Sequence, residues 1–219
     1  MCGRFSLFHN AEEIRRRFKL RKWFREWLKR YNIAPQQQIL IVYSQDGERT
    51  AQEVEWGLIP HWAKTPKPVI NARAESIKEL PTFRDSFNNK RCLIVADGFY
   101  EWQKQGHTKQ PYRITLKGGG LFAFAGLYDD WQGKRTATII TTKPNTLMRP
   151  IHDRMPAILR PEEEDSWLTN QASEALIRLL QPYPDQAMST TQISTKINDT
   201  TNEGPNTIEQ QKLTQQTLT

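Results

Sequence analysis

The residue with the most distinctive chemistry is Cys2, which becomes the first residue once Met1 is removed. An N-terminal cysteine carries an amine and a thiol on adjacent carbons, and an α-amine with a reference pKa of about 7.7–8.0 is partly neutral near pH 7. The amine can attack an aldehyde to form a Schiff base, and the thiol can then close a five-membered thiazolidine. Arg4 can favour the thiolate or hold a phosphate. Alone, a small second residue is more often incidental.

A second candidate is the segment Asn71-Ala-Arg73-Ala-Glu75, which follows a proline-rich loop between Pro60 and Pro68. Such a loop can place the two polar side chains beside a pocket. Asn71 offers a donor and an acceptor that can orient an amine or a sugar oxygen, and Arg73 offers a planar fork for a phosphate. Capping of a helix by Asn71 is an equally good interpretation of this segment by itself.

Two further segments carry groups that can move protons. Glu101 stands between aromatic residues, where burial would raise the pKa of its carboxyl and suit it to proton transfer. Its neighbour Trp102 can stack on a nucleic-acid base. His152 can donate or accept a proton near neutrality, and Arg154 is another candidate for a phosphate. The alternatives are a strand that points Glu101 to water and a histidine with a structural role.

Two tryptophans, Trp56 and Trp62, flank a turn that contains a glycine and a proline. They can form a wall against an unstacked base, although filling the core is the commoner role of a tryptophan. Cys92, the second cysteine, lies in the apolar run 91–96 and is expected to be buried. This leaves Cys2 as the candidate reactive cysteine.

The composition excludes several classes of protein. The chain has 219 residues, a length typical of one domain, and its two cysteines rule out a disulfide framework and suit a reducing cytosol. We expect no membrane span, no signal peptide and no structural metal site. Residues 1–34 hold ten Lys or Arg against three Glu, so this segment carries the whole net charge of +7. Its interleaved aromatic residues make it either a nucleic-acid-binding segment or an amphipathic helix with solvated charges.

These candidate residues must be positioned by a mainly β fold. The expected helices cover residues 11–19, 22–29, 75–80, 162–168 and 173–180, and Asn10 caps the first. The expected strands cover residues 39–43, 51–56, 91–96, 99–102, 112–116, 121–128, 136–142 and 155–159, with Asp46-Gly47 as a hairpin turn. This rhythm predicts an α+β fold with a curved, mainly antiparallel, barrel-like β core flanked by helices.

The segment 185–219 differs in composition, with nine Thr, six Gln, three Asn and no aromatic residue. Such a segment buries too little apolar surface to offset its ordering entropy. We therefore expect one folded domain over residues 1–184 and a disordered, Thr/Gln-rich tail over residues 185–219.

Together these segments resemble the SRAP family, named for SOS-response-associated peptidases and understood as abasic site processing proteins. Six motifs in order span nearly all of the expected folded part and make the resemblance specific, although each alone is weak. The motifs are Met1-Cys-Gly-Arg-Phe5, Tyr31-Asn-Ile-Ala-Pro35, Trp56-Gly-Leu-Ile-Pro60 with Trp62, Asn71-Ala-Arg-Ala-Glu75, Gly98-Phe-Tyr-Glu-Trp102 and His152-Asp-Arg-Met-Pro156.

The resemblance implies a substrate and a set of catalytic roles. The fold would be a mixed α/β fold around a barrel-like core with a basic cleft, and the substrate an abasic deoxyribose, whose open form is an aldehyde. By the resemblance, Cys2 forms the thiazolidine cross-link and Asn71 positions its amine. Glu101 is the acid/base, and His152 transfers protons at the sugar and assists reversal or strand cleavage.

The resemblance also implies contacts to single-stranded DNA. Arg4, Arg73 and Arg154 would hold flanking phosphates, while Trp56 and Trp102 would pack at the DNA junction. Phosphate contacts would make binding salt-sensitive, and a single-stranded substrate avoids the cost of flipping a base out of a duplex. The bonds formed need no metal or organic cofactor. We expect a monomer in the cytoplasm, associated with the nucleoid if the source is a bacterium.

Two other functions stay open from the sequence. Cys2, Glu101 and His152 can form a cysteine-type or N-terminal-nucleophile peptidase, as the family's older name suggests, and self-removal of Met1 is the one peptide cleavage that this arrangement favours. Alternatively, the basic aromatic N-terminal segment can belong to a single-stranded DNA binder without catalysis. Lyase activity at the abasic site would accompany covalent capture of that site, the function that the resemblance implies.

Overall fold

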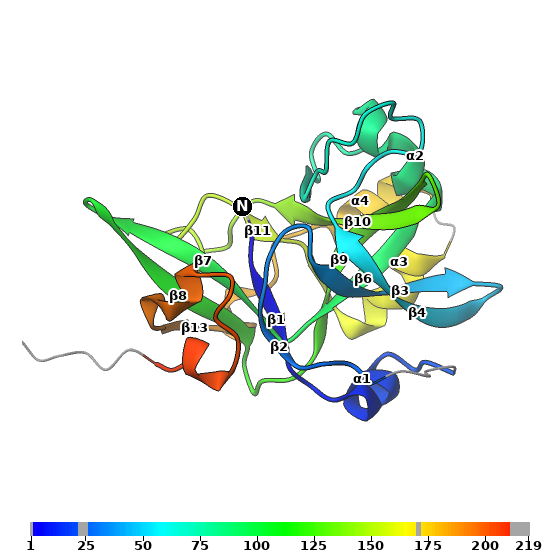
Figure 1. Cartoon of the computed structure of the whole chain (residues 1–219). Coiled ribbons are helices and arrows are strands. Elements are labelled where there is room, and N and C mark those ends of the chain that lie inside the picture. The colour runs from blue at the N-terminus through cyan, green and yellow to red at the C-terminus, as the bar shows by residue number, and fades with distance from the viewer. Residues whose placement is uncertain (1, 22–25, 170–171, 211–219) are drawn as a thin grey trace, which may run out of the picture.

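The protein is mainly β, and the computed structural model describes residues 2–21, 26–169 and 172–210 (Figure 1). Within these ranges the strands are β1 (Phe5–Leu7), β2 (Arg30–Ile33), β3 (Gln38–Gln45), β4 (Glu48–Trp56), β5 (Asn71–Arg73), β6 (Arg91–Ala96), β7 (Gly98–Gln105), β8 (Thr108–Leu116), β9 (Phe122–Trp131), β10 (Lys134–Thr142), β11 (Met155–Pro156), β12 (Ile158–Leu159) and β13 (Met188–Gln192). The helices are α1 (Ala11–Arg17), α2 (Pro81–Asn89), α3 (Glu164–Leu168) and α4 (Ser173–Leu179), with short 3₁₀ helices η1 (Pro161–Glu163), η2 (Asp185–Ala187), η3 (Thr195–Asn198) and η4 (Pro205–Thr207). None of these helices is long and apolar enough to cross a membrane.

Five strands close into a barrel. β10, β4, β3, β6 and β9 pair in this order, and β9 pairs back with β10. Every pair in the ring is antiparallel except β4 with β10, so the expected α+β fold with a mainly antiparallel, barrel-like core is confirmed. The β3–β4 hairpin turns at Asp46 and Gly47, whose φ angles of 52° and 78° fit the type I′ turn that this dipeptide predicts.

A second sheet packs beside the barrel in the order β13-β8-β7-β1-β2, with each neighbouring pair antiparallel. In Figure 1 the long β7–β8 hairpin projects on the side away from α2, α3 and α4. Phe5 of β1 pairs with Phe99 of β7, and Ser6 pairs with Gly98. Continuing this register places residues 2–4 beside residues 100–102, so the fold brings the start of the chain to the middle of β7.

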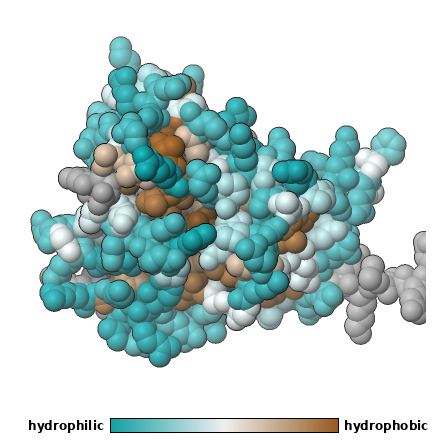
Figure 2. All heavy atoms as spheres, turned by 180° about the vertical axis from the view of Figure 1, so that it is seen from behind, coloured by the Kyte–Doolittle hydropathy of each residue, from teal (hydrophilic) through white to brown (hydrophobic). Residues whose placement is uncertain are grey.

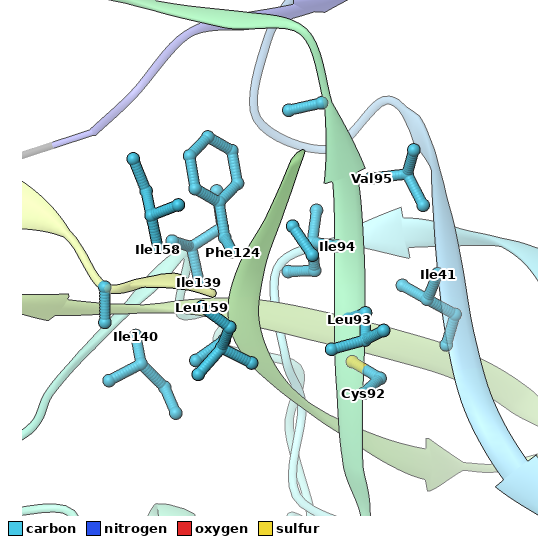
Figure 3. Packing of buried hydrophobic residues seen from close by; sticks show 14 of the residues in the cluster. Ile41, Cys92, Leu93, Ile94, Val95, Phe124, Ile139, Ile140, Ile158 and Leu159 are labelled. Atoms are coloured by element: carbon cyan, nitrogen blue, oxygen red, sulfur yellow. The ribbon is translucent and has the colours of Figure 1, made fainter. Parts of the chain in front are cut away.

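The core fills the barrel and the space beneath the helices. β6 is buried along its whole length, which is why residues 92–96 form an unbroken apolar run instead of an alternating one. Figure 3 shows Cys92 and Ile94 of β6 with Phe124 of β9 and Ile139 of β10 among apolar side chains. Cys92 is therefore a core residue, as expected. The face drawn in Figure 2 is mostly hydrophilic, with apolar side chains in the hollows.

The described part of the basic N-terminal segment is anchored to the protein at several points, although Arg15, Arg16, Lys19, Arg21 and Lys29 are exposed. α1 begins at Ala11 with the expected Asn10 cap. Arg17 pairs with the buried carboxylate of Glu164 at 2.7 Å. Trp27 is buried and donates from Nε1 to the Leu7 carbonyl at 2.9 Å. Of the expected helix over residues 22–29, residues 26–29 are not helical, and residues 22–25 lie outside the described residues.

The expectation of a disordered tail from residue 185 is wrong for residues 185–210. β13 pairs with β8 from Met188 opposite Leu116 to Gln192 opposite Tyr112. Met188, Ile193 and Ile197 are at most 2% exposed. Because backbone pairing on an existing strand satisfies the polar groups, these few apolar anchors are enough to order a Thr-rich segment. The folded domain thus extends beyond residue 184, and residues 211–219 lie outside the described residues.

One helix is displaced from its expected place. Residues 75–80 form turns, and α2 begins at Pro81. Proline is favoured in the first turn of a helix because it lacks the N–H that would be unsatisfied there. The sequence pattern missed this start signal and assigned the helix one turn too early.

Candidate active site

Four of the predicted residues converge from four separate segments. Asn71 of β5 donates from Nδ2 to the Cys2 carbonyl oxygen at 2.8 Å. Burial and, after it, the charge of nearby Glu101 on β7 raise the pKa of the Cys2 thiol. His152 Nε2 lies 3.9 Å from Glu101 Oε2. The predicted catalytic set therefore occupies one place, where the second sheet meets the β5 side of the barrel.

Cys2 is held by the strand that follows it. Tyr100 N–H donates to the Arg4 carbonyl at 2.9 Å, and Phe5 pairs with Phe99, so the chain before β1 continues alongside β7. The Cys2 side chain is 0% exposed, and its Sγ contacts the Arg4 carbonyl oxygen at 4.0 Å. The sulfur of Cys2 is thus enclosed, and Asn71 holds the backbone carbonyl of the same residue.

Asn71 is positioned by the barrel and by the loop that precedes it. Gly57 opens this loop with a φ of 143°, and a Cβ at this residue would lie 2.7 Å from the Cβ of Pro68. Trp56 donates from Nε1 to the carbonyl of Ile70, the residue before Asn71, at 2.9 Å. Trp56 is fully buried, so the prediction that it packs against DNA is wrong. Its large indole is core filling, and its polar edge fixes the strand that carries Asn71.

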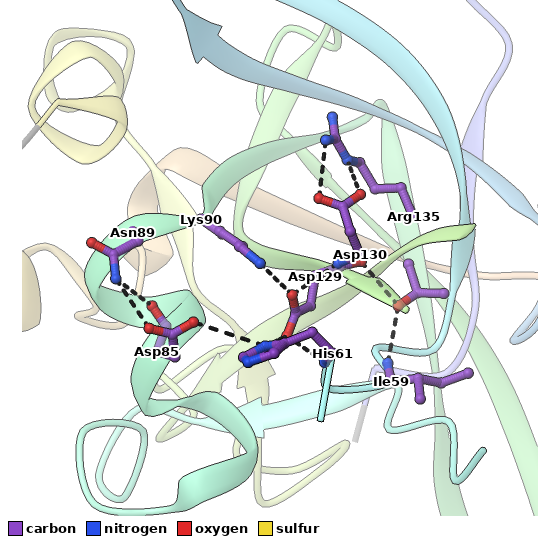
Figure 4. A network of polar contacts seen from close by, with 9 residues as sticks. Ile59, His61, Asp85, Asn89, Lys90, Asp129, Asp130 and Arg135 are labelled. Carbon is purple, nitrogen blue, oxygen red and sulfur yellow. Dashed lines mark hydrogen bonds and ion pairs between the residues drawn. The ribbon is translucent and has the colours of Figure 1, made fainter. Parts of the chain in front are cut away.

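A polar network anchors the far part of the same loop (Figure 4). The buried Asp129 carboxylate accepts from His61 N–H at 2.9 Å, and it contacts His61 Nδ1 at 3.1 Å and Lys90 Nζ at 2.5 Å. Ile59 N–H donates to Thr136 Oγ1 at 2.9 Å. Because β9 and β10 supply the acceptors, residues 59–61 of the loop that leads into β5 are tied to the barrel.

Glu101 is a buried acid with a shifted titration. The residue is 3% exposed, and burial raises its pKa from an ordinary 4.5 to about 7, with the nearby charge of Asp153 acting in the same direction. A group whose pKa lies near the working pH can both give and accept a proton. The Asn71 Oδ1 atom is also buried, and among the described residues it has no hydrogen-bond partner. The site thus offers an acid/base and a spare acceptor next to Cys2.

The tautomer of His152 is set by its own loop. Arg154 N–H donates to His152 Nδ1 at 3.0 Å, so the neutral imidazole carries its proton on Nε2, the nitrogen nearest Glu101. Partial burial lowers the pKa of His152, which favours this neutral form near pH 7. When the ring is charged, Nδ1–H can donate a hydrogen bond to Asp153 Oδ1, which lies 2.8 Å away. Gln103 of β7 donates from Nε2 to the Pro150 carbonyl at 3.0 Å and holds this loop against the second sheet.

Two of the predicted phosphate-binding arginines lie at the end of β5. Arg73 is exposed. Arg154 is clamped by Glu75, with N–O distances of 2.7 and 2.9 Å, and it donates to the Thr141 carbonyl at 2.7 Å. Thr141 pairs with Arg73 in the β5–β10 register, so the two arginines lie at the same end of the barrel. Arg73 is open to solvent, whereas Arg154 already has a carboxylate partner.

The other two predicted DNA contacts, Arg4 and Trp102, lie together beside Cys2. The guanidinium carbon of Arg4 is 5.7 Å from the centroid of the Trp102 ring. Burial lowers the pKa of Arg4. Trp102 is partly exposed and donates from Nε1 to Asn198 Oδ1 at 2.7 Å. Residues from the C-terminal segment therefore contribute to the surroundings of both side chains.

Sequence reasoning missed two exposed basic residues near the site. Lys143 follows β10, and Arg149 stands three residues before His152 in the same loop. Each stands directly before a proline, Pro144 or Pro150, and ahead of the histidine motif, which was the signal that could have found them. As for metals, the ranges that the structure describes contain no group of three His, Cys, Asp or Glu residues arranged to hold an ion.

Comparison with known proteins finds a matching family model, similar chains and a similar fold. A family model described as SOS response associated peptidase (SRAP) matches residues 1–200. The chain is 45% identical to the protein named abasic site processing protein YoqW of Bacillus subtilis (strain 168), across 95% of this chain and 99% of that protein. It is 30% identical to abasic site processing protein HMCES of Xenopus tropicalis, across 94% of this chain and 77% of that protein. A crystal structure of a Bacteroides thetaiotaomicron protein is similar, with a TM-score of 0.85 and 30% identity, and the match covers 96% of this chain and 100% of that one.

Proposed function

This chain belongs to the SOS response associated peptidase (SRAP) family, and from that premise we propose that it captures abasic sites in single-stranded DNA as a covalent thiazolidine on mature Cys2. Processing of abasic sites is the role in the names of relatives at 30% and 45% identity. The observation that carries the proposal is the convergence of Cys2, Asn71, Glu101 and His152 at one place. These residues supply a nucleophile, an orienting amide and two proton carriers.

Capture forms two bonds to one carbon. Removal of Met1 creates the Cys2 α-amine, which attacks the C1′ aldehyde of the ring-opened deoxyribose. Loss of one water from the resulting carbinolamine gives an imine. The Cys2 sulfur then adds to the imine carbon while a proton reaches the nitrogen, which closes the thiazolidine. The net reaction is a condensation that releases one water and changes no oxidation state.

Burial of Cys2 determines the order of the two attacks. Because burial and the charge of Glu101 raise the pKa of the thiol, the sulfur stays protonated near neutral pH, and a neutral thiol is a poor nucleophile. The amine therefore attacks first, and the thiol adds afterwards to the more electrophilic imine. The same environment disfavours a cysteine-type peptidase, whose thiol must be activated before it meets its substrate.

The neighbouring side chains then have distinct tasks. Glu101, with a pKa of about 7, donates a proton to the departing hydroxyl of the carbinolamine and accepts the proton of the thiol. Asn71 holds the Cys2 carbonyl and presents its unpartnered Oδ1 to the amine. His152, when its ring is charged, protonates the sugar oxygen as the ring opens. The neutral ring left behind takes that proton back during reversal, or takes the C2′ proton during strand cleavage, in which the 3′ phosphate leaves.

Binding of the strand rests on cations around the site. Arg73, Lys143 and Arg149 are exposed on the segments that carry Asn71 and His152. Contacts from these side chains to phosphates steer the strand without reading its sequence and weaken as salt displaces them. Trp102, beside Arg4, offers a ring face to a base next to the lesion. We propose that a monomer suffices, because the four reactive residues come from one chain.

The experiment mixes the mature protein with a single-stranded oligonucleotide that contains one abasic site. A denaturation-resistant adduct is expected, with a mass equal to protein plus DNA minus one water. Cys2→Ala should abolish the adduct, whereas Cys92→Ala, the matched change at the buried core cysteine, should leave it. An adduct that survives Cys2→Ala, or no adduct at all, would refute the proposal. Peptide turnover that needs Cys2 and ignores abasic DNA would identify a peptidase instead.

A further inference from the structure

The motif Tyr31-Asn-Ile-Ala-Pro35 has no task in the chemistry above, yet its asparagine is fully buried. Asn32 Oδ1 accepts a hydrogen bond from Arg4 Nη1. On its other side, Asn32 Nδ2 donates to the carbonyl oxygens of Asp199 at 2.8 Å and Asn202 at 2.9 Å, with a longer contact of 3.4 Å to Ile197. One side chain of β2 therefore joins Arg4, two residues from Cys2, to the C-terminal segment.

Residues 193–208, here named the C-terminal clasp, lie beside β2 and β8 and are drawn towards the red end of the colour scale in Figure 1. Ile193 and Ile197 are fully buried and pack with Tyr100. Glu203 binds the other edge of β2, where Oε1 accepts from Arg30 Nε and Oε2 accepts from Tyr31 N–H, each at 2.8 Å. The clasp is thus fastened by a small apolar cluster and by polar contacts on both sides.

The clasp touches both groups that flank Cys2 on this side of the site. The Ile197 carbonyl accepts from Arg4 Nη1 at 2.8 Å, and Asn198 Oδ1 accepts from Trp102 Nε1 at 2.7 Å. Arg4 Nε is buried and has no partner among the described residues, and burial lowers the pKa of Arg4. Its guanidinium is therefore held by one nitrogen while a second nitrogen lacks an acceptor. A cation in this state is prepared for an anion, because the cost of desolvating and ordering it is met before binding.

We propose that Asn32 is a positioning residue that, through the C-terminal clasp, holds Arg4 and Trp102 in place to receive the phosphate and base beside the lesion. The inference rests on the proposed function for the identity of the ligand. It differs from that function in assigning a role to a residue that touches neither DNA nor the reacting atoms. Loosening the clasp should weaken binding of the strand and leave the reactivity of the Cys2 amine and thiol intact.

The test uses Asn32→Asp in the full-length mature protein. The carboxylate keeps an acceptor for Arg4 but turns an oxygen towards the carbonyls of Asp199 and Asn202, which repel it. Glu203→Gln is a milder second variant at the partly exposed edge of the clasp, and it keeps the test decisive if Asn32→Asp does not fold. Asn206→Ala, an exposed change within the clasp but outside the network, is the matched control.

Three readouts separate positioning from general damage. They are the dissociation constant for an intact single-stranded oligonucleotide, the rate of capture of the abasic oligonucleotide at saturation, and the rate of thiazolidine formation with free glyceraldehyde. We expect Asn32→Asp to weaken oligonucleotide binding about tenfold, as loss of one charge-assisted contact does, and Glu203→Gln to weaken it about twofold. Both rates at saturation should stay within about twofold of the wild type, as should every readout for Asn206→Ala.

Unchanged oligonucleotide binding in both clasp variants would overturn the inference. So would an equal fall in binding and in the glyceraldehyde reaction, because a merely structural role predicts that pattern. Failure of the proposed function is distinguishable, since it appears as a wild type that forms no adduct. Weaker binding of intact DNA by Asn32→Asp would support the positioning role even then.

Discussion

Glu101→Gln should make the protein more stable at neutral pH while it disables capture. The side chain of Glu101 is buried in the folded protein, where its pKa rises to about 7. In the unfolded chain the same carboxyl titrates near its ordinary 4.5. Glutamine has almost the shape of the protonated acid, but it never ionises, so the substitution removes the charge.

The size and sign of the effect follow from this difference in pKa. A pKa difference of one unit corresponds to about 1.4 kcal/mol, so holding the Glu101 carboxylate in the folded state costs about 3 kcal/mol. The folded state binds the proton more tightly, so this cost is absent below about pH 4.5, grows as the pH rises, and is complete above about pH 7. Glu101→Gln escapes the cost. We expect the variant to gain about 3 kcal/mol over the wild type at pH 8 relative to pH 4.5, or roughly 6–12 °C in melting temperature.

The assay is chemical denaturation of both proteins at several values between pH 4.5 and pH 8, with the N-terminal residue of each preparation identified by mass. Groups that titrate alike in both proteins cancel in the difference. Glu53→Gln, the same change at an exposed position of β4, controls for the loss of a charge. Capture by Glu101→Gln should be slower by about 10²–10⁴-fold, the range for loss of an acid/base. A stability difference that stays flat across this pH range would refute the reasoning.

Three other substitutions test the surroundings of the site. Asn71→Ala should slow capture about tenfold by removing the bond to the Cys2 carbonyl, with folding retained, as measured by rapid quench and thermal unfolding; an unchanged rate would contradict its orienting role. Glu75→Gln should free Arg154 for phosphates, so a plot of log binding constant against log salt concentration should become steeper by about one. Binding titrations over a range of salt measure this slope, and a slope equal to that of the wild type would contradict the prediction. Asp97→Asn should cost about 2–4 kcal/mol in denaturant unfolding, because the buried carboxylate accepts from the Phe8 N–H at 2.6 Å; a smaller loss would show that the bond is dispensable.

The residues of the candidate site could be predicted from sequence because the chemistry proposed for them depends on residue type. Only a second-position cysteine can offer an amine and a thiol together, and an acid among aromatic residues is a natural candidate for a raised pKa, as Glu101 has. Several of the strands around these residues could also be predicted from the sequence. Buried β6 is a continuous apolar run, and the Asp46-Gly47 turn marks the β3–β4 hairpin.

Features that depend on contacts distant in the chain could not be predicted. Local composition made residues 185–210 look too polar to fold, but the order of this segment comes from its pairing with β8 and from Ile193 and Ile197. Likewise, the hydropathy of a tryptophan does not reveal that Trp56 lies inside the protein, with its Nε1 on the carbonyl before Asn71. Similarly, the sequence around Arg154 does not show that the Glu75 carboxylate binds its guanidinium.

The site is assembled from both sheets, which explains why its parts are so far apart in the chain. Cys2 lies just before β1 and Glu101 lies on β7 of the second sheet, whereas Asn71 comes from β5 on the barrel. The bond from Asn71 to the Cys2 carbonyl crosses this junction, and the Gln103 bond to Pro150 draws the His152 loop across it as well. In the proposed function, the Cys2 amine and thiol therefore meet Glu101 and His152 only when the two sheets are docked. A nucleophile on a free chain end would otherwise sample many positions, so docking supplies the orientation that the short N-terminal segment cannot supply alone.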